Sequence, residues 1–197
     1  MTVTKPELRE RALEARRGLS PVELADLSAR VAQNLSTVPE FRKSMTLATY
    51  VAKEDEVHTA PIIERALKEG KRVVVPLTQP SGLLFFEIGS LDGLAPGNFG
   101  VLEPIPGRGT PPIPLNATDV VLVPLAAWDD GGNRIGYGKG YFDAALRLRG
   151  ASLSIGLALE VQRVEGIPAT TRDVPLDVVV TELRVVRFPN AVASRQN

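Results

Sequence analysis

The alternation of strand and helix patterns is the feature that most constrains how this chain can fold. An apolar run over residues 45–51 is followed by a polar loop and by a helical pattern over residues 61–69, which Gly70 ends. A second apolar run covers residues 73–77. Strand, helix and strand at this spacing predict a βαβ unit, whose two strands are parallel neighbours in a sheet.

Further strands follow the same pattern. Residues 119–124 are a short apolar run between turn signals, which is typical of a central parallel strand. A helical pattern over residues 141–148 and another apolar run over residues 153–159 imply a second crossover. Shorter strands are predicted at three places, residues 83–88, 178–180 and 184–188. The Gly- and Pro-rich residues after 88 predict surface loops.

Two helices are predicted before the first strand. Thr4 and Glu7 have the spacing of a capping box, and the helix that they begin runs to Gly18. Ser20 and Pro21 then begin a second helix. We therefore expect an α/β fold of three layers with a mainly parallel central sheet, opened by an N-terminal helical hairpin. With 197 residues, the chain is expected to form a single domain, residues 1–197.

Composition narrows the classes of function. The 23 basic residues balance the 23 acidic ones, so no overall field favours nucleic acid or an anionic membrane. The absence of cysteine excludes thiolate nucleophiles, zinc–thiolate sites and iron–sulfur clusters. No apolar run approaches the roughly 20 residues of a membrane span, and no signal peptide is apparent. We expect a cytoplasmic monomer that acts on small molecules, with no nucleic-acid or membrane partner.

A glycine-rich segment, residues 129–143, links a predicted buried strand to a helix and holds five glycines in ten residues. Three of them alternate with other residues, at Gly136, Gly138 and Gly140. Such a backbone can approach an anion closely, and Arg134, Lys139 and the start of the following helix add positive charge. The segment predicts a phosphate site; a flexible loop with solvated charges is the alternative.

The kind of phosphate ligand is not fixed by these glycines. A Walker A loop is excluded because Asn133 stands where glycine is required and Gly140 follows Lys139 in place of Ser or Thr. Glu160 lies about 20 residues beyond Gly140, as in dinucleotide-binding sites, but that fingerprint must follow its strand directly. The residues alone leave open a nucleotide- or sugar-phosphate-dependent enzyme and a nucleotide-sensing module.

A longer motif carries a resemblance to a known family. The pair Val123-Pro124 and the run Gly-Asn-Arg-Ile-Gly-Tyr-Gly-Lys-Gly-Tyr-Phe-Asp at residues 132–143 resemble the signature of the 5-formyltetrahydrofolate cyclo-ligase (methenyltetrahydrofolate synthetase) family. The resemblance extends over most of the chain, through Lys5, Arg9, residues 55–57, residues 100–104 and Asp173. It implies ATP-dependent cyclisation of 5-formyltetrahydrofolate to 5,10-methenyltetrahydrofolate, with Mg²⁺. In that reaction the formyl oxygen is phosphorylated, the neighbouring nitrogen attacks and phosphate leaves.

The resemblance implies which residues bind ATP. Lys5 and Arg9 lie four residues apart on one helix face; without the resemblance, a solvated face would be the simpler interpretation. The other implied ATP ligands are Arg134, Ile135, Gly136, Tyr137, Gly138, Lys139, Gly140, Tyr141 and Phe142. Lys139, Arg134 and Tyr141 are the implied catalytic residues, with Lys139 stabilising the transferred phosphoryl group. The family usually has tyrosine where this chain has Phe142, so a catalytic hydroxyl is not expected there.

The folate site is implied in the same way. Its residues are Val51, Glu56, Tyr137, Gly138, Lys139, Gly140 and Tyr141. A carboxylate at Glu56 suits the pterin because it can accept paired N–H donors from the aminopyrimidine edge. Glu54 and Asp55 are adjacent, so an acidic solvated loop is the alternative.

Asp143 and Asp173 match magnesium ligands in the resemblance. Carboxylate oxygens are the donors that Mg²⁺ takes together with phosphate oxygens and water. Asp143 is also placed where an acid in the first turn of a helix would be favoured by the helix dipole. Asp177 lies in a similar acidic stretch, so either it or Asp173 can be the second ligand.

Overall fold

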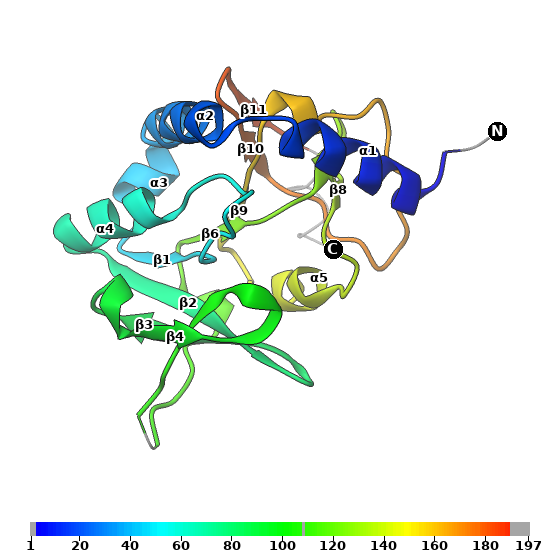
Figure 1. The fold of residues 1–197 in the computed structure, drawn as a ribbon. Helices are drawn as coiled ribbons and strands as arrows, with labels where there is room; N and C mark the ends of the chain where they lie inside the picture. Colours follow the sequence, from blue (N-terminus) through cyan, green and yellow to red (C-terminus); the bar gives the residue numbers. More distant parts are fainter. Residues whose placement is uncertain (1–2, 108, 190–197) are drawn as a thin grey trace.

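The computed structural model describes residues 3–107 and 109–189. The chain begins with α1 (Lys5–Arg17), at the bounds that the capping box and Gly18 predict, and α2 (Pro21–Leu35), which begins where Ser20 and Pro21 predict. The two helices do not pack as a hairpin. Instead, α1 lies against β7 (Ala127–Trp128) and η4 (Glu160–Gln162), whereas α2 covers the sheet (Figure 1). They separate because the apolar residues of each helix meet a different partner.

A seven-stranded sheet forms the centre of the molecule. Its order is β11 (Val185–Arg187), β10 (Val178–Val180), β9 (Leu153–Leu157), β6 (Val120–Val123), β1 (Thr46–Ala48), β2 (Arg72–Gln79) and β3 (Gly82–Ile88). The inner five strands are parallel, and both edge strands are antiparallel to their neighbours. The mainly parallel α/β sheet is therefore confirmed.

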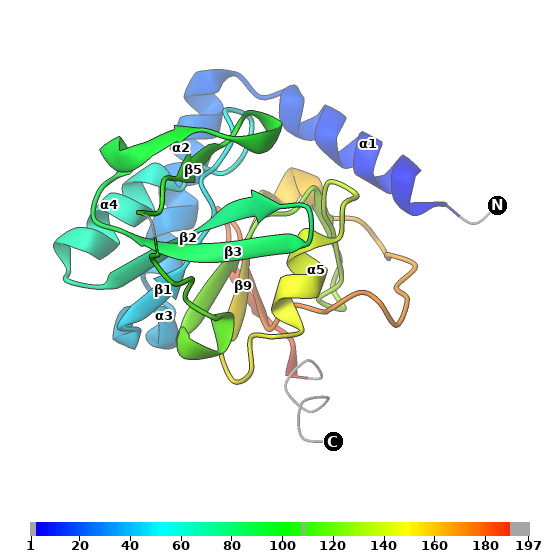
Figure 2. The same ribbon diagram turned by 90° about the horizontal axis from the view of Figure 1, so that it is seen from below.

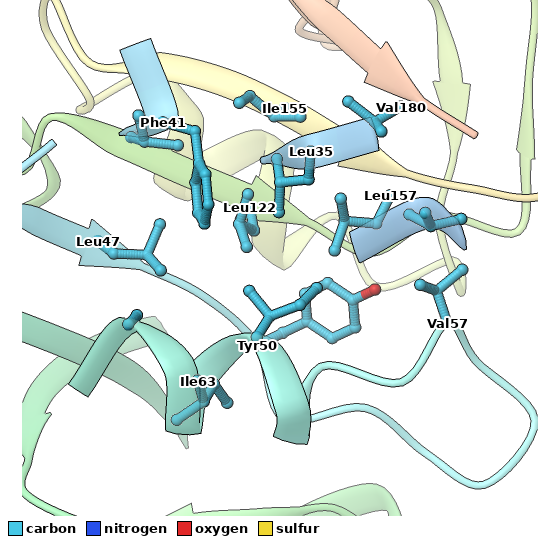
Figure 3. Close-up of a cluster of buried hydrophobic side chains, with 14 of the residues drawn as sticks. Leu35, Phe41, Leu47, Tyr50, Val57, Ile63, Leu122, Ile155, Leu157 and Val180 are labelled. Carbon is cyan, nitrogen blue, oxygen red and sulfur yellow. The ribbon is translucent and has the colours of Figure 1, made fainter. Parts of the chain in front are cut away.

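Alternating side chains of the sheet build two apolar layers. Leu47 and Leu122 face α2, α3 (Pro39–Lys43) and α4 (Ala60–Lys68), in the cluster that Figure 3 shows. Ala48 and Val121 face the opposite side, where Leu146 of α5 (Tyr141–Leu146) packs. Helices thus cover both faces (Figure 2). Each large side chain that becomes fully buried contributes about 1.5–3 kcal/mol to stability.

The Gly- and Pro-rich regions contain more structure than expected. A small sheet pairs β4 (Leu94–Pro96) with β5 (Leu102–Pro104), and β7 pairs with β8 (Arg134–Ile135) inside the glycine-rich segment. Three short 3₁₀ turns accompany them, η1 (Leu91–Gly93), η2 (Asn98–Gly100) and η3 (Leu115–Ala117). Strands of two or three residues are too short for a period-2 pattern to identify.

The strand order creates a switch point between β1 and β6. From β1 the chain continues to β2 on one side, whereas β6, β9 and β10 extend the sheet on the other. Crossovers that leave in opposite directions open a crevice at the carboxyl ends of the two strands. No helix within residues 3–107 and 109–189 is both long and apolar enough to cross a bilayer.

Candidate active site

A cleft with about 1040 Å³ of space, its open mouth included, lies at this switch point. Tyr50 and Val51, two and three residues beyond the end of β1, line it, and so does Pro124, directly after β6. The β2–β3 and β4–β5 hairpins supply much of an apolar wall, through Pro76, Leu83, Phe99, Val101 and Leu102. A ligand there would contact the ends of both central strands.

The glycine-rich segment forms a second part of the wall. Ten residues that the sequence predicts for the site line this cleft, namely Val51, Glu56, Arg134, Gly136, Tyr137, Lys139, Gly140, Tyr141, Phe142 and Asp143. Gly138 and Gly140 have φ angles of +97° and +70°, a region that side chains disfavour, and the chain enters α5 directly after them. Lys139 is exposed and makes no ion pair with any part of the chain that the structure describes.

Arg134 is an almost fully buried residue of this wall. Its side chain is only 2% exposed, and its Nη2 lies 3.1 Å from Oδ1 of Asp143. Nη1 donates to the carbonyl of Val174 at 2.7 Å, and the N–H of Val174 donates to Oδ1 of Asp143 at 3.0 Å. Burial lowers the pKa of Arg134, against the opposing effect of Asp143. The pair therefore fixes the glycine-rich segment to residue 174.

Helix α1 brings two cations to the edge of the cleft. Nε of Arg9 donates to the carbonyl of Gly136 at 2.9 Å. Nζ of Lys5 lies 2.7 Å and 2.6 Å from the two carboxylate oxygens of Asp173. Partial burial raises the pKa of Asp173, but the bonds from Lys5 and Thr170 outweigh it and leave that pKa below its ordinary value. These side chains stand beside the cleft and not in its wall.

The side chain of Ile135 points away from the cleft. It is 2% exposed and packs in a small apolar cluster with Leu8, Ala12, Ala127 and Ile167. Because Ile135 pairs with Ala127 in the β7–β8 hairpin, its side chain faces α1. A contact with ATP would have to come from its backbone.

Glu56 is a buried carboxyl in the wall of the cleft. It is 5% exposed, its Oε2 accepts the N–H of Lys53 at 2.8 Å, and it hydrogen-bonds the hydroxyl of Tyr137. Burial raises the pKa of Glu56 by more than these bonds lower it. Burial and the nearby Glu56 also raise the pKa of Tyr50. A perturbed carboxyl in a cleft is typical of a functional site.

Besides Pro76, Leu83 and other residues of the apolar wall, sequence reasoning missed three residues at the site. Tyr50 lines the cleft next to Val51, and Arg16 contacts Tyr137. Phe99 is 54% exposed, with its ring centroid 6.3 Å from that of Tyr141. Its φ of +59° is rare for a non-glycine residue. Its position directly before the matched residues 100–104 was the available signal.

The two predicted metal ligands, Asp143 and Asp173, each have a cationic partner, Arg134 and Lys5. Within the described ranges, no group of three or more His, Asp or Glu side chains could hold a metal ion. Mg²⁺ beside nucleotide phosphates commonly takes only one or two carboxylates from the protein. Two carboxylates beside a cleft with a glycine-rich wall fit that donor set.

Comparisons with known proteins agree on one family. The model of the 5-formyltetrahydrofolate cyclo-ligase family matches residues 1–182. The 5-formyltetrahydrofolate cyclo-ligase of Escherichia coli is 31% identical over 178 residues, which cover 87% of this chain and 97% of that protein. The enzyme of the same name from Haemophilus influenzae is 29% identical over 185 residues, covering 91% and 98%.

Solved structures give the same result. The 5,10-methenyltetrahydrofolate synthetase of Aquifex aeolicus superposes with a TM-score of 0.83 and is 36% identical, covering 94% of this chain and 93% of that one. That of Mycoplasma pneumoniae has a TM-score of 0.73 at 24% identity, covering 91% and 99%, and supports the fold. The chain therefore belongs to the 5-formyltetrahydrofolate cyclo-ligase family, the enzymes that convert 5-formyltetrahydrofolate to 5,10-methenyltetrahydrofolate.

Proposed function

We propose that this enzyme uses ATP to cyclise 5-formyltetrahydrofolate in the cleft between the ends of β1 and β6. One observation carries the proposal: a single cleft joins a glycine-rich, cationic wall to a buried carboxyl, Glu56, and an apolar wall. The first suits a polyphosphate, and the others suit the pterin ring and its N–H donors. The enzyme is proposed to act as a monomer in the cytoplasm.

The nucleotide half rests on cations that are available for phosphate. Arg9 uses Nε for Gly136, and neither of its Nη nitrogens has a hydrogen-bond partner in residues 3–107 or 109–189. Lys139 projects from the glycine-rich wall and would stabilise the charge that develops on the transferred phosphoryl group. Arg134 would hold that wall in place through its ion pair with Asp143. Tyr141, the first residue of α5, would border both ligands.

The folate half rests on Glu56 and its surroundings. Its carboxylate lies in the wall with Val51 and Tyr137, and burial makes each hydrogen bond to it count more than in water. Leu83 and Phe99 offer apolar surface for the flat ring. Gly138, Lys139 and Gly140 would lie between the two ligands.

The reaction needs positioning more than a protein nucleophile. The formyl oxygen attacks the γ-phosphorus, an O–P bond forms, and the bond to ADP breaks. The neighbouring folate nitrogen then attacks the formyl carbon and loses its proton, and the C–O bond breaks to release phosphate. The cleft would hold the formyl oxygen near the γ-phosphate and exclude competing water.

Asp143 and Asp173 would bind Mg²⁺ together with oxygens of the nucleotide phosphates. A bound Mg²⁺ neutralises charge on the phosphates. If Asp173 binds the ion, its ion pair with Lys5 would break. Lys5 would then be available to bind the nucleotide.

The test is a reaction with both substrates and Mg²⁺ in which methenyl product and ADP are measured together. The expected result is one ADP for each product molecule and no product when ATP is omitted. Product formed at the same rate without ATP would contradict the proposal, and so would ADP released without product.

A further inference from the structure

Helix α1 carries a buried arginine for which the proposed reaction has no use. The side chain of Arg16 is 1% exposed, and its Nη2 lies 2.6 Å from Oδ2 of Asp55 and 3.1 Å from the hydroxyl oxygen of Tyr137. Its Nε is buried without a hydrogen-bond partner among the described residues. Replacing a buried ion pair with apolar side chains is often neutral or stabilising, so stability alone does not explain this arginine.

The hydrogen bond from Arg16 determines where the hydroxyl proton of Tyr137 can point. A guanidinium can only donate, so the phenolic oxygen must accept from Arg16. The proton of the phenol is then directed to its other partner, the carboxylate of Glu56. Burial raises the pKa of Tyr137 most, and the smaller opposite effects of Glu56, which raises it, and Arg16, which lowers it, agree with this order.

We propose that Arg16 is a positioning residue for the folate: it orients the hydroxyl of Tyr137 as a donor to Glu56 and thereby fixes the carboxylate that binds the pterin. This inference rests on the proposed function of Glu56. Asp55 keeps the guanidinium in place, because its carboxylate, 42% exposed, meets the same Nη2.

The helix that carries Arg16 also contacts the nucleotide side of the same segment. Arg9 holds the carbonyl of Gly136, and seven residues later Arg16 holds the side chain of Tyr137. Two adjacent residues of the glycine-rich wall are thus held from one helix at separate points. Loss of the Arg16 contact should therefore affect folate binding far more than nucleotide binding.

The test compares Arg16→Met with Arg17→Met, an exposed neighbour whose ion pair with Glu10 lies at the surface. Affinities for 5-formyltetrahydrofolate and for a non-hydrolysable ATP analogue are measured by calorimetry, separately in the parent and in Tyr137→Phe. Arg16→Met should weaken folate binding about tenfold, as expected when a hydrogen bond to a charged group is lost. Nucleotide affinity should change less than about twofold, and Arg17→Met should change neither.

The double variant, Arg16→Met with Tyr137→Phe, shows whether Arg16 acts on folate binding through the hydroxyl of Tyr137 or in another way. In the Tyr137→Phe background, Arg16→Met should weaken folate binding by less than about threefold, because the hydroxyl through which Arg16 acts is absent. An undiminished tenfold effect there, or equal loss of both ligands, would overturn the proposal. If Arg16→Met does not fold, Arg16→Lys in the same two backgrounds gives the same comparison. Failure of the parent to bind folate or nucleotide would instead refute the proposed function.

Discussion

Glu56→Gln should weaken folate binding and, at neutral pH, stabilise the protein. Burial raises the pKa of Glu56, so the folded state binds its proton more tightly than the unfolded state does. The stability that this carboxyl contributes is therefore fully present below its unfolded pKa, about 4.5, and is lost as the pH rises through the raised folded pKa. An amide never ionises and escapes that loss.

The structure allows glutamine to fit. Its carbonyl can accept the N–H of Lys53, and its amide can donate to the second lone pair of the hydroxyl oxygen of Tyr137, which already accepts from Arg16. We expect a gain of roughly 0.5–2 kcal/mol at pH 7.5, the range that single stabilising substitutions commonly give. For a chain of this size, each kcal/mol raises Tm by about 2–4 °C. At pH 4 the difference should largely vanish.

The same substitution should cost folate affinity. An amide offers one acceptor where the pterin edge needs two, which leaves a donor unpaired at about 1–3 kcal/mol, or roughly 5- to 150-fold in Kd. Thermal unfolding at pH 4 and 7.5 and calorimetric titration of 5-formyltetrahydrofolate measure both effects. Glu54→Gln, exposed and two residues away, is the matched control. If Glu56→Gln behaves like this control in both assays, the carboxyl of Glu56 neither binds the pterin nor destabilises the fold at neutral pH.

Three other substitutions test the nucleotide side and the fold. Arg9→Met should weaken a non-hydrolysable ATP analogue about tenfold and leave folate affinity unchanged, with exposed Arg11→Met as control; equal effects would contradict the assignment. Asp143→Asn should move activity to higher Mg²⁺ and lower stability by about 1–3 kcal/mol, because buried Arg134 loses its counter-charge; an unshifted magnesium curve would exclude a metal role. Gly132→Ala should destabilise by about 1–3 kcal/mol, since its φ is +80° and a Cβ would lie 2.8 Å from Cγ of Phe188, whereas Gly166→Ala meets nothing within 4 Å; equal melting temperatures would refute this.

The parallel sheet could be predicted because its strands are continuous apolar runs between helices. Buried strands such as β6 need apolar residues on both faces, and this pattern is readable without the structure. Both bounds of α1 and the start of α2 could be predicted from capping residues. The packing of α1 was not, because its partners, Ala127 and Ile167, lie more than 100 residues away in the chain.

The site was predictable where a continuous motif carries it and not where tertiary contacts do. The motif at residues 132–143 supplies most of one wall, yet it includes Ile135, whose side chain the β7–β8 pairing directs into the core. In the sequence Arg16 is one of several arginines in a polar helix, and only its contacts with Asp55 and Tyr137 in the structure distinguish it. Phe99 lies in a region whose strands are too short to predict.

The fate of the formyl oxygen distinguishes phosphoryl transfer from other routes to the product. With 5-formyltetrahydrofolate labelled with oxygen-18 in the formyl group, phosphorylation of that oxygen predicts that one labelled atom appears in each molecule of inorganic phosphate released. Mass spectrometry of the phosphate after turnover with ATP and Mg²⁺ measures this transfer. Unlabelled phosphate, with the label recovered in water, would contradict phosphoryl transfer to the formyl oxygen in this cleft.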